Sequence, residues 1–416
     1  MPPSTAPEDL KFDVAAPPGW TFSPGDTIIG NVVRHAPIVA PDAIVTLGLI
    51  GRLRVRISEQ EGPGTYSQHK YTHYRSEWNL INHKLDVISR GPLHLAEGSD
   101  ESLSWPFSID IPTEPIDTVT QNRIQKASFL PLNKDDPACH VLPGSFISAG
   151  KSTIGSCEAY VEYFLKSELR YIRSGSAEAH TVTWPVTVRY PVEEADLFSL
   201  QVSRTQGKIQ SQRLLPGMEN KSLSLKQKTL KAFGSSSVPE FHYQVEFTFP
   251  HVLQLDHPSP IPITLNVVPQ RDKISTNVKE VTPDVHIHEL KILLWRRTSA
   301  RAPTYDKENV RGDTILSSMD FKLETAFRDI QTPLVISIGK GNEPIDLGSI
   351  FQLFLHPNGL TSGKKRYLSR ASVYPTFTSW SIRHTHTLEW KVSLTIAGEF
   401  QTVGASNVPL RIIGAA

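Results

Sequence analysis

Two long runs of alternating polar and apolar residues constrain the fold of this chain more than any other feature. Residues 45–57 (VTLGLIGRLRVRI) and 381–400 (SIRHTHTLEWKVSLTIAGEF) both show the pattern. Successive side chains of a β-strand point to opposite faces of the sheet, so one face of each run is apolar. The apolar positions are Val45, Leu47, Leu49, Leu53, Val55 and Ile57, and then Ile382, Leu388, Trp390, Val392, Leu394 and Ile396. Each run therefore predicts a long antiparallel strand with one buried face.

Shorter alternating stretches and many prolines extend this prediction to the rest of the chain. Further strands are expected at residues 105–112, 159–169, 180–191, 241–249 and 350–356. The 32 prolines are spread along the chain, and proline is poorly tolerated inside helices and central strands. Residues 317–327 have a weak helical pattern, but we favour a strand there. The sequence thus predicts an all-β protein with many turns.

An internal repeat indicates two related halves. Residues 22–33 (FSPGDTIIGNVV) and 259–268 (SPIPITLNVV) each contain a Ser-Pro turn followed by an apolar strand. In the first copy, Gly25 and Asp26 are expected to form the turn. Aligned on the shared NVV, the matching positions are Ile28 with Ile263, Gly30 with Leu265 and Val32 with Val267.

The length of the chain points the same way as the repeat. Its 416 residues exceed what one ordinary hydrophobic core supports, so two domains are expected. We predict two tandem antiparallel β-sandwiches, which span residues 1–195 and 196–416. The boundary is expected near Asp196, in a polar stretch.

Composition argues against several functions. The formal net charge of +1 gives no general attraction to nucleic acid. The two cysteines, Cys139 and Cys157, form neither a disulfide framework nor a zinc-ligand spacing. His384 and His386 alternate on one strand, a spacing that would let them share a metal, but they continue its apolar face and are expected in the core or at a sheet end. With no signal-peptide pattern and no long apolar run, we expect a cytoplasmic protein without a cofactor or metal.

Four stretches, in order along the chain, resemble the arrestin superfamily. They are FSPGDTIIGNVV (22–33), LAEGSDESLSWPFSIDIP (95–112), LPGSF (142–146) with the following EAYVEYFLKSEL (158–169), and FTSWSIRHTHTLEWKVSLTIAGE (377–399) with VPLRII (408–413). The nearest resemblance is to fungal α-arrestin-like trafficking adaptors. It implies two arrestin-like sandwiches and a non-catalytic cytosolic adaptor for endocytosis, trafficking or ubiquitination. Its implied partners are cytosolic tails of membrane proteins and a HECT-type ubiquitin ligase, with recruitment to the plasma membrane or endosomes.

The chain departs from this family at the ligase-docking motif. Related adaptors carry PPxY or LPxY motifs that bind WW domains through a polyproline II turn and the tyrosine ring. Here the Pro-x-Tyr sequence is APTY (302–305), which lacks the first Pro or Leu. Pro303 and Tyr305 are therefore either a weak WW-docking motif or part of an ordinary turn.

Two basic groups are candidates for binding. Arg52, Arg54 and Arg56 lie on one face of a predicted strand. They form either a solvated face paired with acids such as Glu158 or Glu162, or a surface for phosphorylated or acidic cargo, because arginine pairs bidentately with phosphate and carboxylate. The second group, Lys364, Lys365 and Arg366, is predicted in a loop. It is either an ordinary solvated loop or a contact for anionic lipid headgroups.

Two other kinds of protein remain compatible with the sequence. One is a structural subunit of a retromer-like sorting complex, which should show a large, apolar exposed patch. The other is a β-sandwich enzyme or ligand-binding module, which should show a concave pocket with convergent polar groups. The transient adaptor should instead show charged strand faces.

Overall fold

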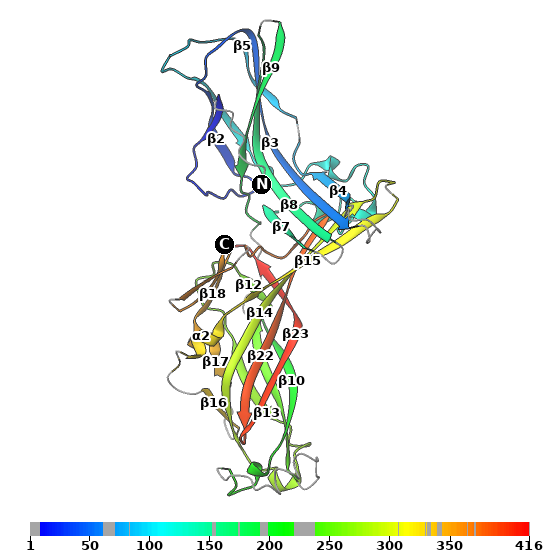
Figure 1. The fold of residues 1–416 in the computed structure, drawn as a ribbon, viewed down its shortest axis with the longest axis vertical. Helices are drawn as coiled ribbons and strands as arrows, with labels where there is room; N and C mark the ends of the chain where they lie inside the picture. Colours follow the sequence, from blue (N-terminus) through cyan, green and yellow to red (C-terminus); the bar gives the residue numbers. More distant parts are fainter. Residues whose placement is uncertain are drawn as a thin grey trace, which may run out of the picture. The chain divides into compact units, whose positions relative to one another are not determined.

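The computed structural model shows an all-β protein that is built from sheets of mostly antiparallel strands, with β12 and β23 paired in parallel (Figure 1). The structure describes residues 9–60, 71–82, 84–151, 155–173, 175–191, 199–219, 238–306, 308–328, 330, 334–338, 343–363, 365–369 and 372–415. The predicted all-β class is confirmed.

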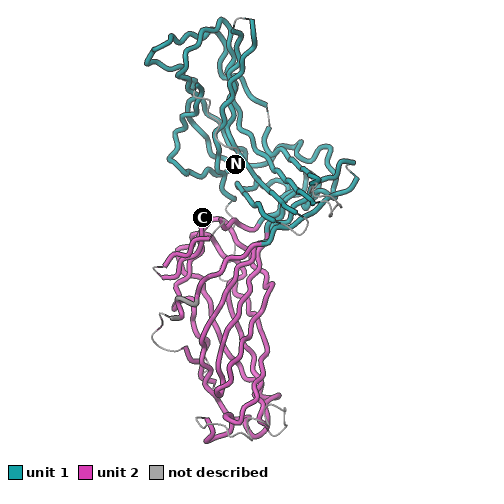
Figure 2. Tube along the Cα trace, viewed as in Figure 1, with its two compact units in different colours: residues 1–191, 297–316, 377–384 teal, residues 192–296, 317–376, 385–416 magenta. Residues whose placement is uncertain are grey.

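The chain forms two compact units (Figure 2). Unit 1 comprises residues 1–191, 297–316 and 377–384, and unit 2 comprises residues 192–296, 317–376 and 385–416. Two segments of unit 1 thus come from the part of the sequence that was predicted as a second domain. The predicted boundary at Asp196 lies outside the described residues.

Unit 1 contains the strands that carry the arginine row. A six-stranded sheet runs in the order β4-β3-β8-β7, with β5 also paired to β3 and β9 to β8, and a three-stranded sheet has the order β1-β2-β6. Their bounds are β1 Leu10–Val14, β2 Thr27–Arg34, β3 Ile38–Gln60, β4 Tyr71–Asn79, β5 Asp86–Leu95, β6 Leu103–Asp110, β7 Phe146–Lys151, β8 Gly155–Arg173 and β9 Ser176–Val186. Short 3₁₀ turns cover Asp117–Thr120, Gln125–Ala127 and Pro137–Cys139.

The remaining strands form three further sheets. Their orders are β10-β11-β13-β17, β18-β19-β20 and β12-β23-β22-β14-β15, with β16 on β14 and β21 on β22. The bounds are β10 Leu200–Gln210, β11 Glu240–Pro250, β12 Val252–Gln254, β13 Thr264–Pro269, β14 Asp284–Pro303, β15 Val310–Asp320, β16 Leu334–Ser337, β17 Ile345–Asp346, β18 Leu353–His356, β19 Gly359–Ser362, β20 Lys365–Leu368, β21 Phe377–Thr378, β22 Ile382–Ile396 and β23 Glu399–Ile413. Two short helices, α2 Leu323–Arg328 and α3 Leu347–Phe351, and 3₁₀ turns at Gln212–Leu214 and Thr276–Val278 complete the described elements.

The two alternating runs are strands, and their predicted apolar faces are buried. The first run lies in β3 and the second in β22. All the apolar positions listed above for the two runs are less than a tenth exposed. The polar and apolar faces of the long strands are therefore set by the sequence alternation itself.

The opening stretch 22–33 is a turn that leads into a central strand. Gly25 has a φ of +92°, a value that glycine adopts without steric strain. Asp26 accepts a hydrogen bond from the backbone N–H of Ser23 at 2.7 Å, so it is a turn residue. Gly30 lies where a Cβ atom would come 2.5 Å from the carbonyl oxygen of Asp13, so only glycine lets β1 approach β2 this closely.

Two predicted strands are strands in one part and helices in the other. In residues 317–327, β15 ends at Asp320 and α2 begins at Leu323. Asp320 accepts a hydrogen bond from the backbone N–H of Lys322, whose φ is +55°, and this local turn ends the strand.

In residues 350–356, α3 precedes β18, because the Asp346 side chain caps the helix through the backbone N–H of Ser349. Alternation alone does not reveal such local capping bonds.

Candidate functional site

The arginine row lies on β3 between β4 and β8, and a buried acid neutralises part of it. The Nε of Arg52 donates to Oε1 of Glu162 at 2.6 Å, and Nη1 of Arg54 lies 3.4 Å from the same oxygen. Glu162 is on β8, directly opposite Arg52, and its side chain is 5% exposed. A carboxylate so buried needs a paired cation, so Arg52 is a counterion of the sheet.

A second acid, Glu77 on β4, completes this ion network. Its Oε2 lies 3.5 Å from Nε of Arg54 and 3.9 Å from Nη1 of Arg52. The register of β3 and β4 places Glu77 directly opposite Arg54. Two cations and two anions thus balance on this part of the face, and Glu77 was not anticipated from the sequence.

Arg56 has a different environment. Its cross-strand neighbours are Arg75 on β4 and Glu158 on β8. Within the described ranges, no carboxylate lies within ion-pair distance of Arg56 or of Arg75, and both side chains are exposed. The uncompensated positive charge of the row therefore lies at the Arg56 end. Anion binding by Arg52, Arg54 and Arg56 stays a prediction.

The APTY segment lies at a hairpin between two strands. Pro303 is the last residue of β14, and the backbone N–H of Thr304 donates to the carbonyl of Asn309 at 3.0 Å. The Thr304 hydroxyl also bonds the Asp306 carboxylate, while the Tyr305 side chain is 84% exposed. Strand and turn hydrogen bonds hold this backbone, whereas a WW ligand needs a free polyproline II turn. WW docking by Pro303 and Tyr305 stays a prediction.

The same segment lines a pocket of about 370 Å³. Its walls are His73, Tyr74, Arg75, Pro303, Thr304 and Tyr305, all of which belong to unit 1. The pocket joins the exposed Arg75 of the arginine face to the exposed Tyr305 of the hairpin. Sequence reasoning missed this site, since its two segments are far apart in the chain.

The second basic group lies on a strand. Lys365 and Arg366 belong to β20, and Lys364 lies outside the described residues. The predicted loop is wrong for residues 365–368, because Lys365 pairs with Ser362 and Arg366 with Thr361 across a tight turn. Both described basic side chains are exposed, and lipid contact by Lys364, Lys365 and Arg366 stays a prediction.

Histidines form the arrangements closest to catalytic ones. In one chain of contacts, Nδ1 of His356 lies 2.7 Å from Asp256 and Nε2 lies 3.2 Å from the Thr361 hydroxyl. Thr361 is on the central strand β19, paired on both sides with β18 and β20. Its hydroxyl is therefore on a sheet face, where no strand end or turn projects it as a nucleophile.

Two other histidines lie in the core, as the alternation predicted. His384 and His386 are each 3% exposed, and each bonds a threonine hydroxyl, Thr298 at 2.9 Å and Thr376 at 2.8 Å. Over the described ranges, no three His, Cys, Asp or Glu side chains gather closely enough to hold a metal ion.

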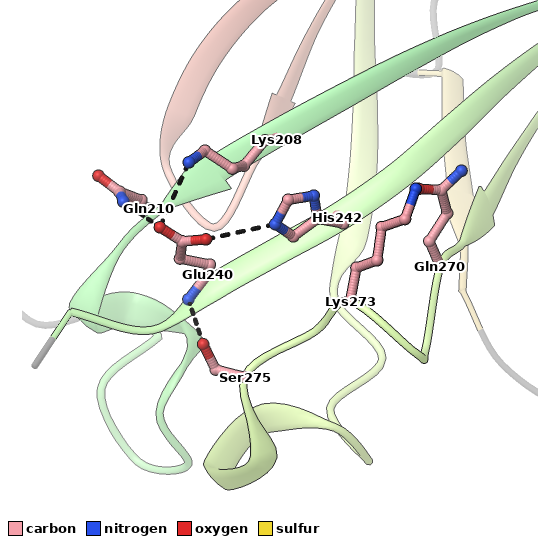
Figure 3. Close-up of polar contacts among 7 residues, drawn as sticks. All are labelled: Lys208, Gln210, Glu240, His242, Gln270, Lys273 and Ser275. Carbon is pink, nitrogen blue, oxygen red and sulfur yellow. Dashed lines mark hydrogen bonds and ion pairs between the residues drawn. The ribbon is translucent and has the colours of Figure 1, made fainter. Parts of the chain in front are cut away.

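A polar cluster at one end of β10 and β11 surrounds Glu240 (Figure 3). The carboxylate accepts from Gln210, lies 3.3 Å from Nζ of Lys208 and bonds His242 at 3.3 Å. These bonds, with that from Gln210 the strongest, lower the pKa of Glu240. The backbone N–H of Glu240 also donates to the Ser275 hydroxyl at 2.9 Å. Because Glu240 is stabilised as an anion, it is suited to hold strand ends together rather than to donate protons.

A buried thiol in unit 1 gives a testable dependence on pH. Cys157 is fully buried, and burial, with the charges of Asp313 and Glu158, raises its pKa from 9.0 to about 12. Above pH 9.0 the thiol of the unfolded chain loses its proton, while the thiol of the folded chain keeps it. The contribution of Cys157 to stability is therefore complete below pH 9.0 and is lost as the pH rises from 9.0 to about 12. At about pH 10 the loss is about 1.4 kcal/mol.

We therefore expect Cys157→Ala to weaken the alkaline loss of stability. Free energies of unfolding of the wild type and the variant are compared at about pH 8 and about pH 10. The wild type should lose about 1.4 kcal/mol more than the variant between the two conditions. The packing cost of the alanine is the same at both and cancels. Equal losses would show that Cys157 does not keep its proton in the folded state.

No protein-family model and no curated protein matches the sequence. In the described part of the chain, no helix has the length and apolar character to span a membrane. Fold and surface together define an all-β protein with an ion-paired sheet face and a pocket beside it.

Proposed function

We propose that the chain is a non-catalytic, arrestin-like cytosolic adaptor that binds the cytosolic tails of membrane proteins for endocytosis, trafficking or ubiquitination. The observation that carries the proposal is a contact between two of the stretches that resemble the family. Phe146 of LPGSF packs against His384 of the C-terminal stretch, with ring centroids 5.0 Å apart. Residues that resemble the family in sequence thus share one core in unit 1.

The proposal includes two tandem sandwiches, and the packing of unit 2 supports this architecture. One apolar cluster contains Phe241, Val245 and Phe247 of β11 together with Trp390 and Val392 of β22. These strands belong to different sheets. Side chains from two sheets that fill one core are the basic feature of a sandwich.

The repeat in the sequence corresponds to a repeat in topology. β2 lies between β1 and β6, and β13 lies between β11 and β17. Each is followed by the next long strand, β3 after β2 and β14 after β13. This order is what two related sandwiches would produce.

Adaptor function is favoured over a permanent subunit by the charged face of β3. Obligate interfaces are mostly apolar and depleted in charge, whereas this sheet face carries Arg54 and Arg56 of β3 and Arg75 of β4, all exposed to solvent. Charged faces of this kind suit transient partners and fast, reversible binding. Cargo recognition, rather than ligase docking through APTY, is the activity that we assign to unit 1.

Proximity labelling with the full-length chain in its native cell tests the proposal. We expect labelled proteins to be enriched in membrane proteins with cytosolic tails and in endocytic or ubiquitination components. A set dominated by subunits of one stable sorting complex, recovered in fixed proportion, would overturn the adaptor proposal in favour of a structural subunit. Labelling of neither class would contradict both.

A further inference from the structure

The pocket beside the hairpin is lined by a strand at the edge of its sheet. Three consecutive residues of β4 line it, namely His73, Tyr74 and Arg75. Tyr74 lies opposite Ile57 on the buried face of the sheet, while the two flanking residues lie on the other face. Because consecutive residues of a strand belong to opposite faces, a pocket lined by all three borders the backbone of β4. In the described part of the sheet, β4 pairs with β3 alone and is an edge strand.

A free edge has backbone groups that can pair with another strand. In an antiparallel pair, alternate residues direct their N–H and C=O groups away from the partner. The hairpin segment 303–305 lines the same pocket as residues 73–75 of β4. An extended peptide in this groove would gain main-chain hydrogen bonds from β4, as in other cases of strand addition.

The positive charge of the groove favours an anionic ligand. Arg75 lines the groove and lies directly opposite Arg56 on β3. Like charges at directly opposed positions destabilise a sheet, and no carboxylate of the described residues pairs with either guanidinium. An anionic group of a ligand would relieve this repulsion and accept charge-assisted hydrogen bonds.

The opposite wall is ordered before a ligand arrives. Asp306 accepts a hydrogen bond from the backbone N–H of Glu308 at 3.0 Å and bonds the Thr304 hydroxyl, which fixes the turn. Pro303 and Tyr305 then present an apolar ring and an exposed aromatic ring to the groove. A preorganised wall reduces the entropy cost of binding.

We propose that this groove binds an extended peptide segment of a partner protein, which adds as a strand to β4 and places an anionic side chain against Arg75. The anion is a carboxylate or a phosphate, and Tyr74 and Tyr305 contact the neighbouring side chains of the peptide. The inference rests on the proposed adaptor function, since it names the docking site and the chemistry of the cargo. It also gives Tyr305 a role as a groove wall, which WW-domain docking would exclude.

Selection from a phage-displayed library of random peptides on the full-length protein tests the proposal. Selected peptides should share an Asp or Glu within an extended, proline-poor core. Resynthesised with a fluorescent label, they should lose about tenfold or more in affinity for Arg75→Glu and about three- to tenfold for Tyr305→Ala. Hydrogen exchange should show slower amide exchange in β4 when peptide is bound.

Matched variants separate the possible outcomes. Arg90→Ala removes an exposed arginine on β5 and should leave binding unchanged. Replacing the selected acid with phosphoserine or with glutamine distinguishes phosphate from carboxylate recognition, and the glutamine peptide should bind weakly. Three results would overturn the proposed peptide-binding groove. They are unchanged peptide affinity for Arg75→Glu, slower amide exchange outside β4 in place of β4, and failure to select any peptide. The selected peptides could bind as expected while proximity labelling finds no membrane proteins with cytosolic tails. That combination would support the peptide-binding groove and overturn the adaptor function.

Discussion

Arg52→Ala is expected to lower the free energy of unfolding of the protein by about 2–3 kcal/mol, because the buried carboxylate of Glu162 loses its shortest ion pair and keeps the longer contact with Arg54. Arg52 donates to that carboxylate at 2.6 Å and is itself 22% exposed. Removing one partner of a fully buried pair costs about 3–5 kcal/mol, and partial exposure of the arginine reduces this amount. Its guanidinium also lies 5.2 Å from the Phe164 ring centroid, and that contact is lost as well.

Arg56→Ala is the matched control on the same strand and face. Its guanidinium has no carboxylate partner in the described ranges, so its loss should change stability by less than about 0.5 kcal/mol. Both free energies come from urea unfolding of the full-length chain, with hydrogen exchange to locate the effect in β3 and β8. The double variant Arg52→Ala with Glu162→Gln should recover part of the loss, since no buried charge remains. If Arg52→Ala were as mild as Arg56→Ala, the ion pair would not be a structural element.

The strand faces could be predicted from the sequence because they depend on local alternation. Leu53 and Arg54 are adjacent in the chain, yet one is buried and the other half exposed. Side chains of a strand alternate between its two faces, so this difference in exposure follows from the sequence of β3 alone, whichever strands it pairs with. The same argument predicted the buried positions of His384 and His386.

Which charges meet across strands could not be predicted in the same way. Of the two acids expected to pair with the arginine row, Glu162 pairs with Arg52, and Glu77, to which the sequence does not point, pairs with Arg54. The register of β3 and β4 decides that Glu77 lies opposite Arg54 and Arg75 opposite Arg56. A shift of one residue would move each of these side chains to the other face, and the alternation of β3 alone does not fix that register.

The groove was still less accessible from the sequence. It joins residues 73–75 to residues 303–305, and only the tertiary fold brings them together. Tyr305 belongs to a linear Pro-x-Tyr motif, and a linear motif carries no information about the opposite wall. Residues 317–327 show a related limit, since a hydrogen bond from the backbone N–H of Lys322 to the Asp320 side chain ends the strand there.

Phe146→Ala should cost about 3–5 kcal/mol, which is the usual range for removing a buried phenylalanine. The ring is 3% exposed and lies edge-on to Phe377, with centroids 5.0 Å apart, and at the same distance from His384. Phe377 and His384 are themselves opposed in the pairing of β21 and β22. The lost ring therefore held a segment of unit 1 that is remote in the sequence.

The expected signature is faster hydrogen exchange in residues 377–384 together with the fall in stability. Phe146→Leu retains much of the volume and should cost about half as much or less. Phe400→Ala removes a ring that is 64% exposed and should change stability by less than about 0.5 kcal/mol. A global loss with unchanged exchange at 377–384 would contradict the role of Phe146 as the anchor. In that case the stacked rings of Trp78 and Trp380, 6.0 Å apart, would suffice to hold the segment.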